Sequence, residues 1–191
     1  VTALTLSPLF VVTGAFERGE DFERRLRRAL SAGAGLVQLR VPGADARRLL
    51  ELGAVAASIV RTEHARLVVN ASPGDWPILR ESGLFDGLHL AARHAAACDR
   101  RPVAAGELLG VSCHDVAELA RASEIGADYA LLGSVMRTAS HPGQPGIGWG
   151  RFSEWVQDLP LPVFALGGML PEDIPGAWCR GAQGIAGIRG L

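Results

Sequence analysis

Short apolar runs alternate with amphipathic stretches along almost the whole chain. The runs are rich in Val, Leu and Ile, which is the composition of strands buried on both faces. Between them, apolar residues recur at steps of three and four, as in Leu49, Leu52 and Ala56, so these stretches predict helices with one buried face. We predict strands at 9–14, 36–41, 66–71, 87–91, 108–113, 129–135, 162–167 and 184–189. Later helices are expected at 115–125 and 150–159.

This alternation predicts a parallel sheet built from β/α units. Eight units in series favour a closed (β/α)8 TIM barrel, because closure leaves no strand edge exposed. The chain ends at Leu191, directly after the eighth predicted strand, so we expect a minimal barrel that lacks its last helix. The main alternative is a doubly wound open sheet, but the first predicted strand is followed by Gly14-Ala15-Phe16 and not by a GxGxxG motif.

At 191 residues the chain is expected to form a single domain, 1–191. Its start at Val1 and the missing last helix suggest a domain excised from a longer fusion protein. The flank after the last strand would then be covered by residues 1–8, by a second subunit of a homodimer, or by another domain.

Composition narrows the function. The net charge of −1 gives no reason to expect binding to nucleic acid or to a membrane surface. No apolar run approaches the roughly 18 residues of a membrane span, and three scattered cysteines are typical of a reduced, cytoplasmic protein. The 19 basic residues are all arginine. Without lysine, Schiff-base chemistry is excluded, and a phosphate would have to be bound by arginine, hydroxyls or backbone amides.

Candidate site residues are collected at strand ends, because the chemistry of a β/α barrel takes place at that rim. Gln38 and Arg40 are two residues apart and therefore share a face of the second strand. An arginine at the barrel mouth indicates phosphate or pyrophosphate binding, with an ion pair to a barrel carboxylate as the alternative. Asn70 ends the third strand, where it could bind substrate or cap a helix.

The fourth and fifth strands supply a histidine and a serine. His89 lies within its strand, as a substrate contact or as a histidine satisfied in the core. Ser112 could bond a ligand oxygen or local backbone. His114-Asp115 is typical of a helix start rather than of a base.

The loop after the sixth strand combines hydroxyls and a histidine with several glycines. Thr138, Ser140 and His141 are its candidate donors, and a solvated turn is the alternative. A phosphate site is expected after the last two strands, as is usual for this fold. Its candidates are Gly167, Gly168, Ile188 and Arg189.

The expected rim lacks paired carboxylates. Ala71 follows Asn70, and Asp86 precedes its strand, which places it at the opposite rim. Mg²⁺ usually takes one or two carboxylates together with substrate phosphate. We therefore predict no protein-held metal, and Mg²⁺ only through a substrate pyrophosphate.

Taken together, the motifs resemble those of the thiamine-phosphate synthase and thiazole tautomerase superfamily. They are VQLR at 37–40, VVN at 68–70, DGLHL at 86–90, GVSCH at 110–114, GADYALLGSVMRTAS at 126–140, FALGG at 164–168 and GAQGIAGI at 181–188. The resemblance implies a TIM barrel. Its synthase members join a pyrimidine pyrophosphate to a thiazole phosphate with Mg²⁺, through a carbocation.

The resemblance also assigns residues to the substrates. Gln38, Arg40 and Asn70 would face pyrimidine and pyrophosphate. The residues implied around the thiazole or product phosphate are Ser112, Thr138, Ser140, Gly167, Gly168, Ile188 and Arg189.

The chain departs from the synthase pattern at four positions. Pro42 and His141 stand where the synthase motif has lysines, and Ala71 and His94 where it has metal-binding aspartates. The tautomerase histidine aligns with Ser134.

Two hypotheses follow from the resemblance. The first is an enzyme of synthase or tautomerase type, with Arg40, Ser112 and His141 as catalytic candidates. The second is a catalytically reduced barrel that binds a small phosphorylated heterocycle, thiazole phosphate or thiamine phosphate. The SHPG sequence and the GIRGL end are similar to the barrel fused to Nudix (MutT-like) hydrolases, which would place a hydrolase partner in cis.

Overall fold

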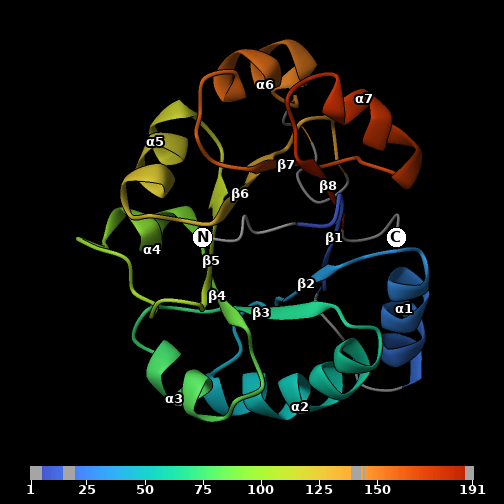
Figure 1. The fold of residues 1–191 in the computed structure, drawn as a ribbon, viewed down its shortest axis with the longest axis vertical. Helices are drawn as coiled ribbons and strands as arrows, with labels where there is room; N and C mark the ends of the chain where they lie inside the picture. The colour runs from blue at the N-terminus through green and yellow to red at the C-terminus, as the bar shows by residue number, and fades with distance from the viewer. Residues whose placement is uncertain (1–5, 15–19, 139–142, 144, 188–191) are drawn as a thin grey trace.

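A closed barrel of eight parallel strands forms the centre of the molecule (Figure 1). The computed structural model describes residues 6–14, 20–138, 143 and 145–187. The strands are β1 (Leu9–Val12), β2 (Leu36–Leu39), β3 (Arg66–Asn70), β4 (Gly87–Leu90), β5 (Leu108–Cys113), β6 (Tyr129–Gly133), β7 (Val163–Leu166) and β8 (Gly184–Gly187). Each strand pairs with its neighbour in sequence, and β1 pairs with β8 in the register Leu9↔Ile185. The predicted TIM barrel is confirmed, and the open sheet is excluded.

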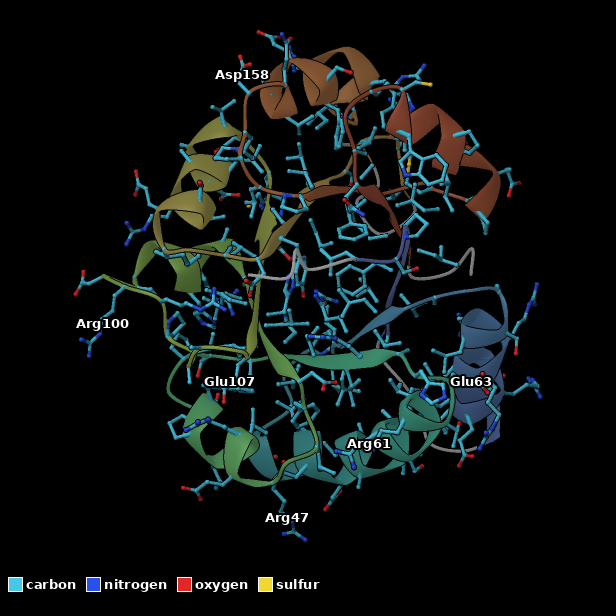
Figure 2. All side chains as sticks on the ribbon, viewed as in Figure 1. Arg47, Arg61, Glu63, Arg100, Glu107 and Asp158 are labelled. Carbon is cyan, nitrogen blue, oxygen red and sulfur yellow. The ribbon has the colours of Figure 1, made fainter. Side chains whose placement is uncertain are left out.

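The helices lie outside the barrel, as Figure 1 shows. They are α1 (Glu20–Ser31), α2 (Ala46–Thr62), α3 (Trp76–Glu81), α4 (Ala92–Ala96), α5 (Val116–Glu124), α6 (Gly148–Val156) and α7 (Ile174–Trp178), with a 3-10 turn η1 (Pro171–Asp173) before α7. Charged side chains such as Arg47, Arg100 and Asp158 project outward from this layer (Figure 2). No helix in the described ranges is long and apolar enough to cross a membrane.

Helix boundaries follow local capping. The Asp115 side chain accepts a hydrogen bond from the Glu118 N–H at 2.9 Å, so it caps α5 as the sequence predicts. Asp45 does the same for α2 through the Arg48 N–H at 2.8 Å. Helix α6 was predicted at 150–159. It begins two residues earlier, at Gly148, and ends three residues earlier, at Val156.

Several strands end earlier than the apolar runs predict, and β2 shows why. It ends at Leu39, and the next backbone N–H, that of Arg40, donates to the Thr13 side-chain oxygen at 2.8 Å instead of a strand carbonyl. The Thr13 side chain therefore replaces a strand carbonyl as the acceptor for the Arg40 N–H, and β2 ends there.

Aromatic side chains fill the inside of the barrel. Phe10 packs edge-on against Tyr129 and Phe164, with ring centroids 5.3 and 5.4 Å apart. Gly110 makes room for the Tyr129 ring, because a Cβ at that position would lie 2.2 Å from its Cζ. The barrel interior is therefore a packed core, and a ligand has to bind above it, at the strand ends.

At the opposite rim, two aspartates that precede β4 and β6 accept hydrogen bonds from the backbone of β3 and β5. The Asp86 carboxylate accepts the Leu67 N–H at 2.7 Å, and Asp128 accepts the Leu109 N–H at 2.7 Å. The prediction that Asp86 lies away from the site is confirmed.

Candidate ligand-binding site

A cavity of about 810 Å³ opens at the carboxyl ends of the strands. Four of the predicted site residues line it: Gln38, Arg40, Asn70 and Ser112. They come from β2, β3 and β5 or the residue that follows, so these strand ends lie at one rim. Apolar side chains, including those of Val12, Leu131 and Leu166, complete its wall.

Arg40 lines this cavity with an exposed side chain. Within the described residues its guanidinium forms no ion pair, so the alternative of a structural pair with a barrel carboxylate is not found there. Gln38 is 1% exposed, and its Nε2 has no hydrogen-bond partner. A buried amide without a partner costs about 1–3 kcal/mol. Both groups are therefore free to contact an anionic or polar ligand.

Beneath the cavity, three polar side chains form a chain of hydrogen bonds. His89 is fully buried in β4, with Nδ1 3.1 Å from Tyr129 Oη and Nε2 2.8 Å from Ser112 Oγ. Burial, with a smaller effect of the Arg40 charge, lowers the pKa of His89 from 6.5 to about 3. His89 is therefore neutral near pH 7. It is not among the residues that line the cavity and reaches it only through Ser112.

The direction of these hydrogen bonds follows from what each group can do. The fully buried Tyr129 hydroxyl has His89 Nδ1 as its one acceptor among the described residues, so it donates to Nδ1. The neutral ring must then carry its proton on Nε2, which donates to Ser112 Oγ. The Ser112 hydroxyl consequently keeps its own hydrogen for an acceptor in the cavity.

Several cavity residues were not among the predicted ligand contacts. Ser72, Asp75, Arg93, His94 and His114 line the same space. Asp75 accepts a hydrogen bond from Ser72 Oγ at 2.6 Å, and His114 Nδ1 lies 2.8 Å from a carboxylate oxygen of Glu118. The Ser-x-x-Asp spacing at 72–75 is the one signal by which sequence could have located Asp75.

The donors around the cavity do not suit a protein-held Mg²⁺. The positions where the sequence resemblance implies metal-binding aspartates carry Ala71 and His94, and both line the cavity. Asp75 is the one cavity-lining carboxylate in the described ranges, and Ser72 already occupies one of its oxygens. No group of three or more His, Cys, Asp or Glu that could hold a metal occurs among the described residues. Octahedral Mg²⁺ prefers carboxylate, water and phosphate oxygens.

Only part of the predicted sixth loop can be placed. Thr138 is half-buried, and its Oγ1 has no hydrogen-bond partner. Ser140 and His141 lie outside the described residues.

The expected phosphate site is also partly described. Gly167 and Gly168 follow β7 with φ values of 104° and 73°, which favour glycine. Their N–H groups donate no hydrogen bond within the described part of the chain. They pack against the start of the sixth loop, since a Cβ on Gly167 would lie 2.7 Å from Ser134 Cβ. Neither glycine lines the cavity itself. Ile188 and Arg189 lie outside the described residues.

Comparison with known proteins identifies the family. The family model described as thiamine monophosphate synthase matches residues 9–191. The chain belongs to this family. It is 34% identical to a putative thiamine-phosphate synthase of Geobacter sulfurreducens, over 96% of this chain and 85% of the relative. A putative thiamine-phosphate synthase 2 of Aquifex aeolicus is 30% identical, over 97% of each chain.

A solved structure supports the same assignment. Thiamine phosphate pyrophosphorylase of Pyrococcus furiosus superposes with a TM-score of 0.74 at 26% identity, covering 94% of this chain and 84% of that one. Membership in the thiamine monophosphate synthase family thus agrees in sequence and in fold.

Proposed function

We propose that this member of the thiamine monophosphate synthase family binds a phosphorylated thiazole or thiamine-type compound at the carboxyl rim of its barrel. The free guanidinium of Arg40 on the cavity wall carries the proposal. Guanidinium groups bind phosphate oxygens through paired, charge-assisted hydrogen bonds. In this binding mode the heterocycle lies against Val12, Leu131 and Leu166, and the unpaired amide of Gln38 donates to it.

We propose a second polar position for the ligand at the turn after β7, which directly follows the cavity-lining Leu166 but does not itself line the cavity. The free N–H groups of Gly167 and Gly168 and the unpaired hydroxyl of Thr138 are donors of the kind that bind a phosphate. Ile188 and Arg189 belong to the same proposed subsite on sequence grounds.

The proposed reaction is thiamine-phosphate synthesis, after relatives named thiamine-phosphate synthase and putative thiamine-phosphate synthase. The bond from the pyrimidine methylene carbon to pyrophosphate breaks first, pyrophosphate leaves with the electron pair, and the thiazole nitrogen then bonds to the resulting carbocation. Arg40 would stabilise the departing pyrophosphate, and Ser112 would donate to an acceptor on the substrate. His141 stays a catalytic candidate from the sequence.

A second candidate is ligand binding without turnover. Ala71 and His94 favour it, because they leave the rim without the carboxylates that would hold Mg²⁺ against the leaving group. In that case the barrel serves as a binding or docking domain. A Nudix hydrolase in cis and a homodimer are predictions of the sequence for its partner.

A turnover assay separates the two candidates. The chain is incubated with the pyrimidine pyrophosphate, thiazole phosphate and Mg²⁺, and the thiamine phosphate formed is measured. The same assay is run on Arg40→Met. Product that depends on Arg40 supports the enzyme. Thermal stabilisation by thiamine phosphate without product supports the binding domain, and ligand at 100 times Kd should add about 2.7 kcal/mol to the free energy of unfolding. If the assay gives no product and thiamine phosphate does not stabilise the chain, the proposed function is contradicted.

A further inference from the structure

Arginines outnumber carboxylates around the cavity, since two arginines and one aspartate line it in the part of the chain that the structure describes. Arg40 lies at the end of β2, and Arg93 and His94 follow β4. None of the three forms an ion pair within the described residues. Asp75 is the cavity-lining carboxylate in the described ranges and is bonded to Ser72, while His114 lies 2.8 Å from a carboxylate oxygen of Glu118. The cavity therefore presents unneutralised positive charge.

The spacing of the strands places this charge on two sides of one space. Strand β3 lies between β2 and β4, and neighbouring strands are about 4.8 Å apart, so the ends of β2 and β4 are about 10 Å apart. Arg40 directly follows β2, and Arg93 lies on α4, which follows β4. Ala71 follows β3, between these two strands, and its small side chain lines the cavity. An elongated anion could contact both arginines at once.

His94 adds an unsatisfied group to the same wall. Its Nδ1 is buried and has no hydrogen-bond partner. Buried polar atoms in proteins almost always have one. Nδ1 has almost no accessible surface as the ring lies, so a ligand oxygen between Arg40 and Arg93 would supply the missing contact after the ring turns Nδ1 toward the cavity.

We propose that Arg40, Arg93 and His94 form a diphosphate site that binds the anion directly, without a bridging divalent cation. The proposal rests on the proposed function, since it assigns the diphosphate end of a substrate or product to this wall. Two guanidinium groups would repel Mg²⁺, and Asp75 alone offers little to retain it. Direct contacts from arginine replace the charge that a metal would otherwise supply.

Calorimetric titration with inorganic diphosphate tests the proposal. The chain should bind diphosphate in the presence of EDTA. Arg93→Met and His94→Ala should each raise Kd, the former by about tenfold or more, because a hydrogen bond to a charged group contributes about 1.5–3 kcal/mol. Arg100→Met is the matched control, since Arg100 projects outward from the barrel and should not affect Kd (Figure 2). Excess Mg²⁺ should weaken binding by sequestering the diphosphate.

The outcomes separate this proposal from the proposed function. Diphosphate binding that requires Mg²⁺, or an unchanged Kd in Arg93→Met, would overturn the metal-free site. Thiamine phosphate titrated into the same preparation reports on the proposed function. If thiamine phosphate binds while diphosphate without Mg²⁺ does not, the proposed function stands and the metal-free site is wrong.

Discussion

Ser112 Oγ lies 2.8 Å from Nε2 of His89, which is itself bonded to Tyr129 at 3.1 Å. This relationship links the packed barrel interior to the ligand cavity. Because Tyr129 has no other acceptor among the described residues, the hydrogen bonds run from Tyr129 to His89 to Ser112. The orientation of a hydroxyl in the site is thus determined by a tyrosine in the core.

The tautomer of His89 follows from this arrangement. Nitrogen NMR at pH 7 should show Nδ1 without a proton and Nε2 protonated, because the Tyr129 hydroxyl occupies Nδ1. In Tyr129→Phe the constraint is lost, and a mixture of the two tautomers is expected. The opposite tautomer in the unmodified protein would refute the direction of the hydrogen bonds.

Acid should destabilise the protein through His89. Its pKa is near 3 in the folded state, against 6.5 for an unperturbed histidine, so below pH 6.5 the unfolded chain binds a proton that the native state does not. The stability is present above pH 6.5 and is lost as pH falls toward 3, by roughly 1.4 kcal/mol per pH unit. Between pH 7 and 5 the unmodified chain should lose about 2 kcal/mol more than His89→Gln does.

Urea unfolding at the two pH values measures this difference. Carboxylate titration is common to both proteins, so it cancels in the comparison. Equal losses in the two proteins would mean that His89 is not buried in its neutral form.

The turn after β7 can be tested with a pair of glycine variants. Gly167 has a φ of 104°, and a Cβ there would lie 2.7 Å from Ser134 Cβ, whereas Gly106 has a φ of 89° and open space around it. Both alanine variants should lose about 1 kcal/mol through backbone strain. Gly167→Ala should lose a further 1–3 kcal/mol, about the usual cost of overpacking.

Urea unfolding again provides the measurement, and ligand titration adds a second one. Gly167→Ala should also bind thiamine phosphate more weakly, because the Gly167–Gly168 turn belongs to the proposed phosphate subsite. If both variants are equally stable and bind equally, the close packing of this turn against Ser134 has no energetic role.

The sequence predicted the fold well because the fold repeats one signal. Each apolar run is a strand buried on both faces, and the eight runs could be counted without knowledge of any contact. Strand ends were predicted less accurately. At Arg40 the Thr13 side chain accepts the hydrogen bond that a strand carbonyl would accept, and a contact between residues 27 positions apart cannot be read from a local pattern. Asp86 was placed at the far rim correctly, because a residue directly before a strand lies at the rim opposite the strand's carboxyl end.

The site was predicted in part for the same reason. Gln38, Arg40, Asn70 and Ser112 were found by position at strand ends, and they do share one cavity. Asp75, Arg93 and His94 also line this cavity but were not among the predicted site residues, because they lie beyond the strand ends, in a loop and on a short helix. The role of Tyr129 could not be read from the sequence, since its bond to His89 joins residues 40 positions apart inside the barrel.

The most direct test is calorimetric titration of the pyrimidine pyrophosphate into the unmodified chain and into Arg40→Met. Arg40 lines the cavity without an ion-pair partner among the described residues, so its loss should leave folding intact and affect only the ligand. We predict one ligand per chain and a Kd at least about tenfold higher in the variant. Absence of binding to the unmodified chain, or equal Kd values in two folded proteins, would contradict the central claim that this cavity holds a phosphorylated heterocycle through Arg40.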